Sequence, residues 1–129
     1  MSQIKIYALR DHLTKVREPL SDVIHSCVMD VLGLPEGKRA HRFIHLSRED
    51  FYMPEGRTDA YTILEISMIS GRSKESKKKL VSTLFDRIEN LVGVNKADLE
   101  ICIYESPGEN WGFRGMHGDE VRLPYNIKI

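Results

Sequence analysis

An arginine and a serine stand immediately before a stretch with helical spacing, at Arg72 and Ser73. Ser73 is a plausible N-cap residue, because a serine hydroxyl can accept a hydrogen bond from a free backbone N–H of the first helical turn. The guanidinium of Arg72 would then lie beside the positive end of the helix, where carboxylates and phosphates bind. We therefore expect a local anion site at Arg72. Four lysines raise the local charge further, or alternatively form only a solvated helix face: Lys74, Lys77, Lys78 and Lys79.

Two other patterns resemble cofactor sites. His41 and His45 are four residues apart, which on a helix would place two metal ligands on one face. The residues around them follow a strand-like pattern, which would separate their Cα atoms by roughly 13 Å, too far to share one ion. Gly112, Gly115 and Gly118 are spaced GxxGxxG, whereas the dinucleotide fingerprint needs GxGxxG between a strand and a long helix. We expect no metal and no other cofactor, and we interpret these glycines as turn residues.

Charge and composition exclude several classes of protein. Nineteen Lys and Arg residues balance nineteen Asp and Glu residues, so the basic excess of a general nucleic-acid binder is missing. No apolar run approaches the roughly 18 residues that span a bilayer, and the first residues do not follow the plan of a signal peptide. We expect a cytoplasmic protein that binds neither nucleic acid nor membranes. Cys27 and Cys102 lie in apolar patterns outside any CxxC pair, which predicts buried, reduced thiols.

The elements that would position the anion site repeat along the chain. A shift of 60 residues aligns the two halves without a gap over most of their length, as an internal duplication would. Residues 3–9 and 61–69 have strand-like composition, and helical spacing follows each of them. The two helical stripes, interpreted as core, fall on one another residue by residue: Leu20, Ile24, Val28 and Val31 on Leu80, Leu84, Ile88 and Leu91.

Turn residues and a second pair of strands complete each repeat. Gly33 and Gly93 follow the helical stretches, where a left-handed glycine commonly ends a helix. Pro19 leaves the start of the first helix open by several residues. Phe51 falls on Trp111, so the repeat extends beyond the second strand of each half. We predict a single domain over residues 1–129, made of two β-α-β units at about 1–60 and 61–120.

The predicted fold class is α+β. Because β-α-β crossovers are right-handed, two such units side by side form a four-stranded sheet with both helices on one face. The other face would stay bare and mix apolar with charged side chains: Tyr61, Ile63, Ile69, Phe43, Lys5 and Glu65. Another subunit is its expected cover. Residues 121–129 alternate apolar and polar positions, which predicts an edge strand in need of a partner.

A duplicated β-α-β unit of this length resembles the tautomerase superfamily, the group of 4-oxalocrotonate tautomerase, macrophage migration inhibitory factor and malonate semialdehyde decarboxylase. The decarboxylase branch is most similar, through LGLPEGKRAHRF after the first helix, SGRSKESKK before the second, and ENWGFRG after the last long strand. The resemblance covers nearly the whole chain. It implies a homotrimer, and it implies an N-terminal proline, exposed by removal of the initiator Met, as the usual catalyst.

The resemblance places Ser2 at the position of that proline. If Met1 is removed, Ser2 offers a primary α-amine with a pKa of roughly 7.7–8.0, which could shuttle protons or form a Schiff base. Lys38 stands where the decarboxylase branch has an acidic residue, which argues against decarboxylation by that mechanism. Of the two arginines that bind substrate carboxylate in the decarboxylase, Gly71 replaces the first and Arg72 matches the second.

The expected substrate-binding residues beside Arg72 come from two segments. Trp111 and Phe113 match aromatic residues that wall the family's pocket, although Trp111 would serve equally as a core residue. Arg114, in the glycine-rich turn, would be held over that pocket. Lys38 and Arg39, in the GKRA segment, complete the set.

Three functional hypotheses follow. The first is an enzyme that acts on a carboxylate-bearing carbonyl compound, such as a 2-oxo or enol acid, with proton transfer by the amine of Ser2. The second is a trimeric protein that kept the pocket and lost the chemistry, and that binds a small anion or a protein partner. The third is an unrelated ferredoxin-like binding module, which would leave the sequence matches to chance.

Overall fold

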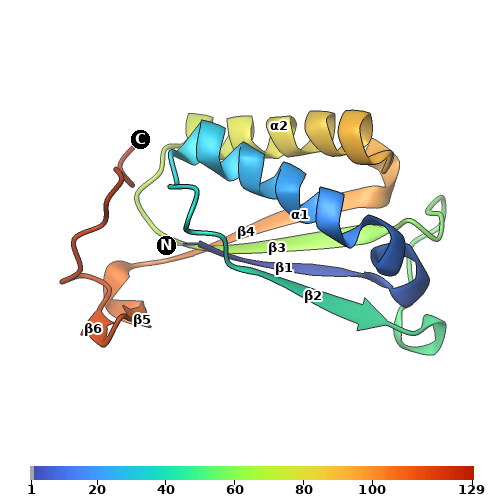
Figure 1. Cartoon of the computed structure of the whole chain (residues 1–129), viewed down its shortest axis with the longest axis horizontal. Helices are drawn as coiled ribbons and strands as arrows, with labels where there is room; N and C mark the ends of the chain where they lie inside the picture. The colour runs from blue at the N-terminus through green and yellow to red at the C-terminus, as the bar shows by residue number, and fades with distance from the viewer. Residues whose placement is uncertain (1) are drawn as a thin grey trace.

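The structure, a computed structural model, describes residues 2–129 and contains two β-α-β units in that range (Figure 1). The first unit consists of β1 (Ser2–Leu9), α1 (Arg10–Leu32) and β2 (His41–Leu46). The second consists of β3 (Thr62–Ile69), α2 (Lys74–Val92) and β4 (Leu99–Ser106). Short 3-10 helices follow β2, precede β4 and follow β4, at Arg48–Asp50, Lys96–Asp98 and Gly108–Asn110. A small hairpin of β5 (Gly112–Phe113) and β6 (Met116–His117) comes last.

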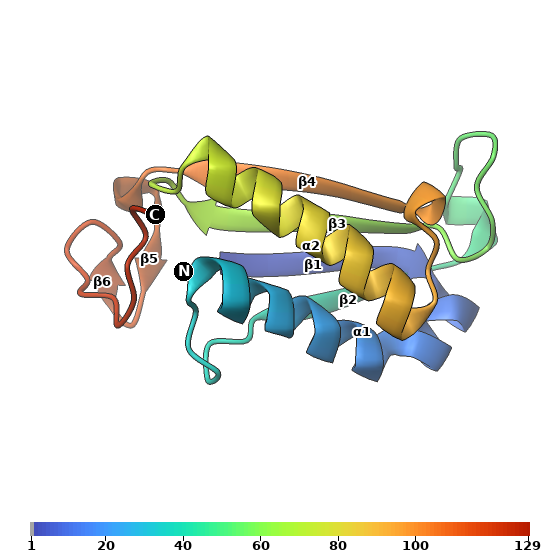
Figure 2. The same cartoon turned by 90° about the horizontal axis from the view of Figure 1, so that it is seen from above.

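The main sheet has the strand order β2-β1-β3-β4, and both helices cover one face of it (Figures 1 and 2). Within each unit the two strands are parallel, whereas β1 and β3 pair antiparallel where the units meet. The predicted duplicated α+β architecture is therefore confirmed.

The core lies between the sheet and the helices. Alternate residues of the two central strands point at the helices and are buried, as Ile4, Ile6, Leu64 and Ile66 show. Each helix contributes an apolar stripe with steps of three and four residues: Leu13, Leu20, Ile24, Cys27 and Val28 from α1, and Leu80, Leu84 and Ile88 from α2. The predicted core stripes are confirmed with one exception, because Leu91 is 66% exposed at the end of α2.

The helix ends follow the predicted local chemistry. Gly33 and Gly93 adopt left-handed conformations, with φ of 71° and 87°, and their N–H groups bond to the preceding turn. The hydroxyl of Ser73 accepts a hydrogen bond from the N–H of Ser76, so the predicted N-cap is confirmed. Pro19 does not mark the start of α1, which runs through it from Arg10.

The open face of the sheet differs from the prediction in part. Ile63, Lys5 and Glu65 do occupy it, on residues that alternate with the buried ones. Phe43, however, pairs with Ile6 and packs against the helix-side core. A strand of six residues with apolar side chains on both faces does not reveal its orientation, which explains that error.

Two further residues expected on that face, Tyr61 just before β3 and Ile69 at its last position, are each only 3% exposed. Tyr61 bonds to Glu100 on that face and is covered by the stacked ring of Phe51. Cys102 was predicted to be buried and is exposed on the open face, in register with Glu65, whereas Cys27 is buried as expected.

Residues 121–129 do not form the predicted edge strand. No strand forms over residues 121–129 among the residues described; that segment runs back past the start of α2, and Pro124 cannot donate to a strand ladder. Its pairing with another subunit's sheet stays a prediction. Within residues 2–129, no helix is long and apolar enough to cross a membrane. The same residues contain no group of three or more His, Cys, Asp or Glu side chains that could hold a metal.

Candidate functional site

The candidate residues gather at one end of the sheet. Figure 2 shows the beginning of β1, the beginning of α2, the β5-β6 hairpin and residues 121–129 at that end. The connection from α1 to β2, which contains Lys38 and Arg39, lies there as well. Topology explains this, because β1 and β2 begin where β3 and β4 end.

Arg72 is the most unusual side chain of this end. It is 5% exposed, and its Nη1 donates a hydrogen bond of 3.2 Å to the carbonyl oxygen of Ile69. Among the residues that the structure describes, its Nε and Nη2 atoms are buried without a partner. Burial lowers the pKa of this guanidinium, while Tyr125 and Glu105 oppose that shift. A buried arginine with idle donors is costly unless an anion completes its hydrogen bonding.

A small cavity lies on the other side of Tyr125, a neighbour of this arginine. It has a volume of about 70 Å³ and is lined by Lys38, Phe113, Arg114, Leu123 and Tyr125. Three of these residues were predicted to bind substrate, and the structure brings them together from two segments that are far apart in the sequence. Tyr125 connects the cavity with Arg72: burial raises the pKa of its hydroxyl, and the nearby Arg72 lowers it again.

Sequence reasoning missed Leu123 and Tyr125 as site residues. The alternation over residues 121–129 was the available signal, and it was interpreted as a strand. Within the described residues, the hydroxyl of Tyr125 is buried without a hydrogen-bond partner. Tyr125 and Arg72 lie close enough for hydrogen bonding to shift the pKa of each, but among the described residues no hydrogen bond of regular geometry joins the Tyr125 hydroxyl to Nε or Nη2 of Arg72.

The β5-β6 hairpin supplies the aromatic side of the site. Arg114 adopts a positive φ of 55° at the turn, and its guanidinium lies 5.5 Å from the ring centroid of Phe113. Trp111 is half-buried; the N–H of Gly118 bonds to its carbonyl oxygen at 2.7 Å. A Cβ on Gly118 would come within 2.6 Å of the Trp111 side chain, so glycine is required for this close approach. Trp111 directly precedes β5, packs close to Gly118 and does not line the cavity.

Ser2 begins β1 at the same end. It is 4% exposed and pairs with Met68, four residues before Arg72. Met1 lies outside the described residues, so the removal of that residue, on which a free amine at Ser2 depends, stays a prediction.

The lysines of α2 are mostly solvated. Lys77 forms an ion pair of 2.8 Å with Glu105, whereas Lys74, Lys78 and Lys79 are exposed. The alternative given for these lysines, a solvated helix face, fits their positions better than an anion site does.

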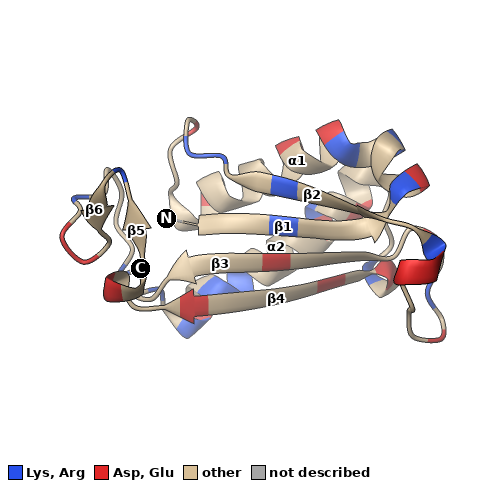
Figure 3. Cartoon of the chain, turned by 90° about the horizontal axis from the view of Figure 1, so that it is seen from below, with Lys and Arg blue, Asp and Glu red and all other residues tan. Residues whose placement is uncertain are grey.

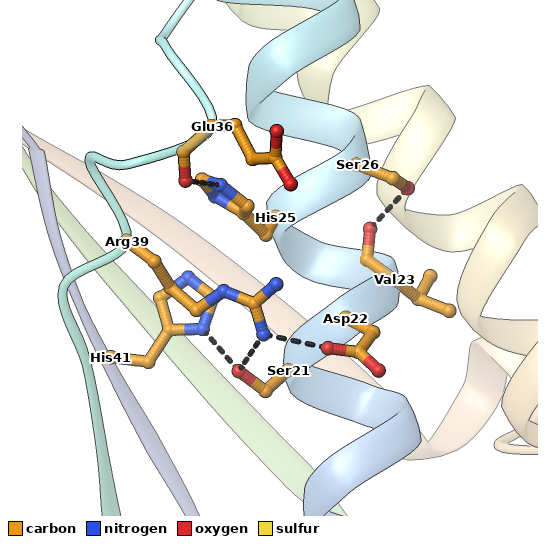
Figure 4. Close-up of polar contacts among 8 residues, drawn as sticks. All are labelled: Ser21, Asp22, Val23, His25, Ser26, Glu36, Arg39 and His41. Carbon is orange, nitrogen blue, oxygen red and sulfur yellow. Dashed lines mark hydrogen bonds and ion pairs between the residues drawn. The ribbon is translucent and has the colours of Figure 1, made fainter.

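Arg39 is turned toward α1 instead of the cavity. Its Nη1 lies 2.7 Å from a carboxylate oxygen of Asp22 and 3.3 Å from the hydroxyl oxygen of Ser21 (Figure 4). The same serine lies 2.8 Å from Nδ1 of His41, while Nε2 of His25 bonds to the carbonyl oxygen of Glu36. This polar cluster fastens the α1–β2 connection to α1.

The two histidines of this cluster meet edge to face, with ring centroids 6.1 Å apart. Burial, with the nearby charge of Arg39 and the nearby His25, lowers the pKa of His41 to about 4. His41 is therefore neutral at physiological pH.

The opposite end of the sheet contains a larger hollow of about 810 Å³, at the first turn of α1. Arg10, His12 and Lys15 line it, together with the exposed ion pair of Arg48 with Asp59. None of the residues predicted to bind substrate lies there.

The chain is an α+β protein whose four-stranded sheet is built from two β-α-β units, with a buried arginine just before the second helix. The sequence profile of a family described as "Tautomerase enzyme" matches residues 38–114. The chain belongs to this tautomerase family. The matched range contains every predicted binding residue and excludes Ser2.

Individual relatives agree with that assignment. The probable tautomerase YusQ of Bacillus subtilis (strain 168) is 27% identical over 101 residues, which are 74% of this chain and 80% of the relative. The 2-hydroxymuconate tautomerase of Comamonas testosteroni is 33% identical over 57 residues, 44% of this chain and 90% of the relative.

Solved structures show the same fold. A malonate semialdehyde decarboxylase structure has a TM-score of 0.79 at 20% identity and covers 88% of this chain and 92% of its own. A fused 4-OT, described as an asymmetric trimer, has a TM-score of 0.79 at 18% identity and covers 91% of this chain and 96% of its own.

Proposed function

We propose that the chain binds a small carboxylate-bearing carbonyl compound, a 2-oxo or enol acid, with its carboxylate on Arg72. The observation that carries this proposal is the burial of Arg72 with Nε and Nη2 unpartnered among residues 2–129. These two nitrogens form one edge of the guanidinium, which suits the two oxygens of a carboxylate. The start of α2 adds its partial positive charge to the same place.

Proton transfer by the amine of Ser2 is the reaction that we assign to this site. After removal of Met1, the amine would take the proton of an enol hydroxyl and return a proton to the adjacent carbon, so that the reaction is an isomerisation. Phe113, Leu123 and the ring of Tyr125 would enclose the remainder of the ligand. The position of Ser2 at the same end of the sheet as Arg72 supports this assignment.

The test of the binding site is the substitution Arg72→Ala. A charge-assisted hydrogen bond contributes about 1.5–3 kcal/mol, so we expect the affinity for phenylpyruvate, measured by titration calorimetry, to fall about tenfold or more. Arg17→Ala is the matched control, because Arg17 is exposed on α1. Equal affinities for the Arg72→Ala and Arg17→Ala proteins would reassign Arg72 to a structural role.

A second candidate function is binding of the same anion without catalysis. The serine at position 2 favours it, because the resemblance places the family's catalytic proline there and serine has no secondary amine. An intact carboxylate site with no turnover of any 2-oxo or enol acid would support this alternative.

We also propose that the protein is a homotrimer. On the open face, positive side chains lie on β1 and β2 and negative ones on β3 and β4 (Figure 3), among them Lys5, Arg42, Glu65 and Glu100. Copies arranged around a threefold axis would place the positive strands of one subunit near the negative strands of the next. Sedimentation equilibrium should give three times the chain mass of 14.9 kDa; a stable monomer at micromolar concentration would contradict the proposal.

A further inference from the structure

The segment 121–129, here called the covering segment, closes the site around Arg72. Its Tyr125 lies against the guanidinium closely enough for each group to shift the pKa of the other. Its Ile127 lies over the turn before α2, where a Cβ on Gly71 would come within 3.0 Å of the backbone oxygen of Ile127. Its Ile129 accepts hydrogen bonds of 2.9 Å from the hydroxyls of both Ser73 and Ser76.

The open space that the covering segment borders is small. Leu123 and Tyr125 of this segment line a cavity of about 70 Å³, which Arg72 does not reach, whereas sites for small organic molecules usually hold about 300–1,000 Å³. With Arg72 only 5% exposed, an anion in solution cannot reach its idle nitrogens while the segment lies in this position.

The backbone oxygen of Ile129 also occupies the place that an anion would take at the start of α2. It accepts hydrogen bonds from the hydroxyls of Ser73 and Ser76, and the Ser76 hydroxyl could otherwise donate to an oxygen of a ligand. The segment therefore satisfies the helix start but leaves Arg72 unsatisfied. That difference gives an entering carboxylate a partner that the closed protein does not supply.

We propose that the covering segment is a gate, and that a ligand reaches Arg72 only after this segment has left the start of α2. The proposal rests on the proposed function of Arg72 as an anion site and adds its regulation. The anchors of the gate are few: two serine hydroxyls, one aromatic ring and one contact over a glycine. Opening would take Tyr125 from the edge of the core, against which it packs, and would leave the buried residues of β1, β3, α1 and α2 in place.

Phenylglyoxal, which modifies arginine side chains, tests the gate without any carboxylate ligand. Labelling is followed at each arginine by peptide mass spectrometry, with exposed Arg17 as the reference within the same molecule. We expect Arg72 in the unaltered chain to react about tenfold or more slowly than Arg17, since it reacts only through local opening. Equal rates at the two arginines in the unaltered chain would overturn the gate.

Ser76→Ala removes one anchor and leaves the cap hydroxyl of Ser73 in place. Loss of one hydrogen bond should raise the labelling rate of Arg72 about fivefold, and Tyr125→Ala should raise it as well. Thr83→Ala is the matched control, because the Thr83 hydroxyl bonds only within α2. Unchanged labelling of Arg72 in both the Ser76→Ala and the Tyr125→Ala proteins would also overturn the gate.

The two proposals fail separately. Should Arg72→Ala leave phenylpyruvate affinity unchanged while Ser76→Ala accelerates labelling, the segment is a gate over a site of another function. Should the affinity fall and the labelling prove insensitive to Ser76 and Tyr125, the site binds carboxylate and the gate proposal is wrong.

Discussion

The two β-α-β units share a backbone plan but pack their helices on their outer strands differently. In the first unit, polar side chains join α1 to β2 and the residues before it, with His25, Arg39 and His41 in one cluster (Figure 4). Sixty positions later, the second unit has Phe85, Leu99 and Ile101, which are apolar and belong to or pack against the core.

The starts of the two helices differ as well, and here the second unit has the more elaborate polar contacts. At α2, Ser73 caps the helix and the covering segment buries Arg72. At α1, no side chain among the described residues caps the first turn, and His12, at the position equivalent to Arg72, lines an open hollow. Burial lowers the pKa of His12, so this side chain is a poor cation. The two starts differ in backbone as well, because His12 lies within the first turn of α1 whereas Arg72 lies in the turn that precedes α2. The duplicated fold therefore presents a capped helix start with a buried arginine in its second unit alone among the described residues.

The largest expected effect concerns the amine that only the first unit can supply, since the position equivalent to Ser2 is Thr62 within the chain. Ser2→Pro should raise the rate of phenylpyruvate ketonisation about tenfold or more, because it restores the secondary amine that the family uses for general acid–base catalysis. The rate is followed by loss of the enol absorbance. In the unaltered protein, the pH–rate profile should show a limb at roughly pH 7–8, near the pKa of an α-amine.

A variant that retains Met1 is the control for this prediction, and it should lose the activity. No gain from Ser2→Pro, together with an inert unaltered protein on a panel of 2-oxo acids, would favour binding without catalysis.

A smaller effect concerns the polar cluster of the first unit. Burial lowers the pKa of His41 to about 4 in the folded protein, whereas a histidine in the unfolded chain titrates near 6.5. The unfolded chain therefore binds the extra proton first. The contribution of neutral His41 to stability is complete above about pH 6.5 and is lost as the pH falls to about 4.

His41→Ile copies Ile101 of the second unit and should remove this pH dependence. The free energy of unfolding is measured with urea at pH 7 and at pH 4.5. The unaltered protein should lose stability between these two pH values, and the variant should lose up to about 2 kcal/mol less, after allowance for the partial exposure of His41. His117→Gln is the matched control, since His117 is exposed on β6. The same pH dependence in both variants would refute the assignment to His41.

Sequence reasoning predicted the fold well, because the duplication doubled each signal. A helical stripe, a glycine after it and a strand on either side are individually weak, but their recurrence after 60 residues made the topology almost unambiguous. The same reasoning placed Arg72 and Ser73 correctly at the start of α2, since capping depends on a few neighbouring residues.

The errors lie where tertiary contacts override local pattern. Leu91 continues the apolar spacing of α2 but extends past the sheet into solvent. Arg39 is paired with Asp22, a contact that spacing does not reveal. Tyr125 belongs to an alternating segment whose partner is the start of α2 instead of a strand, and pattern alone cannot distinguish these partners.

The joint between β1 and α1 has a consequence for how this chain can vary in length. β1 ends at Leu9 and α1 begins at Arg10, whereas residues 70–73 separate β3 from α2. One residue inserted between Leu9 and Arg10 would rotate α1 by about 100° about its axis, and would turn Leu13 and Leu20 away from the sheet. The turn at 70–73 can absorb an insertion in its own backbone. Insertions and deletions should therefore be tolerated at the start of the second helix and excluded at the start of the first.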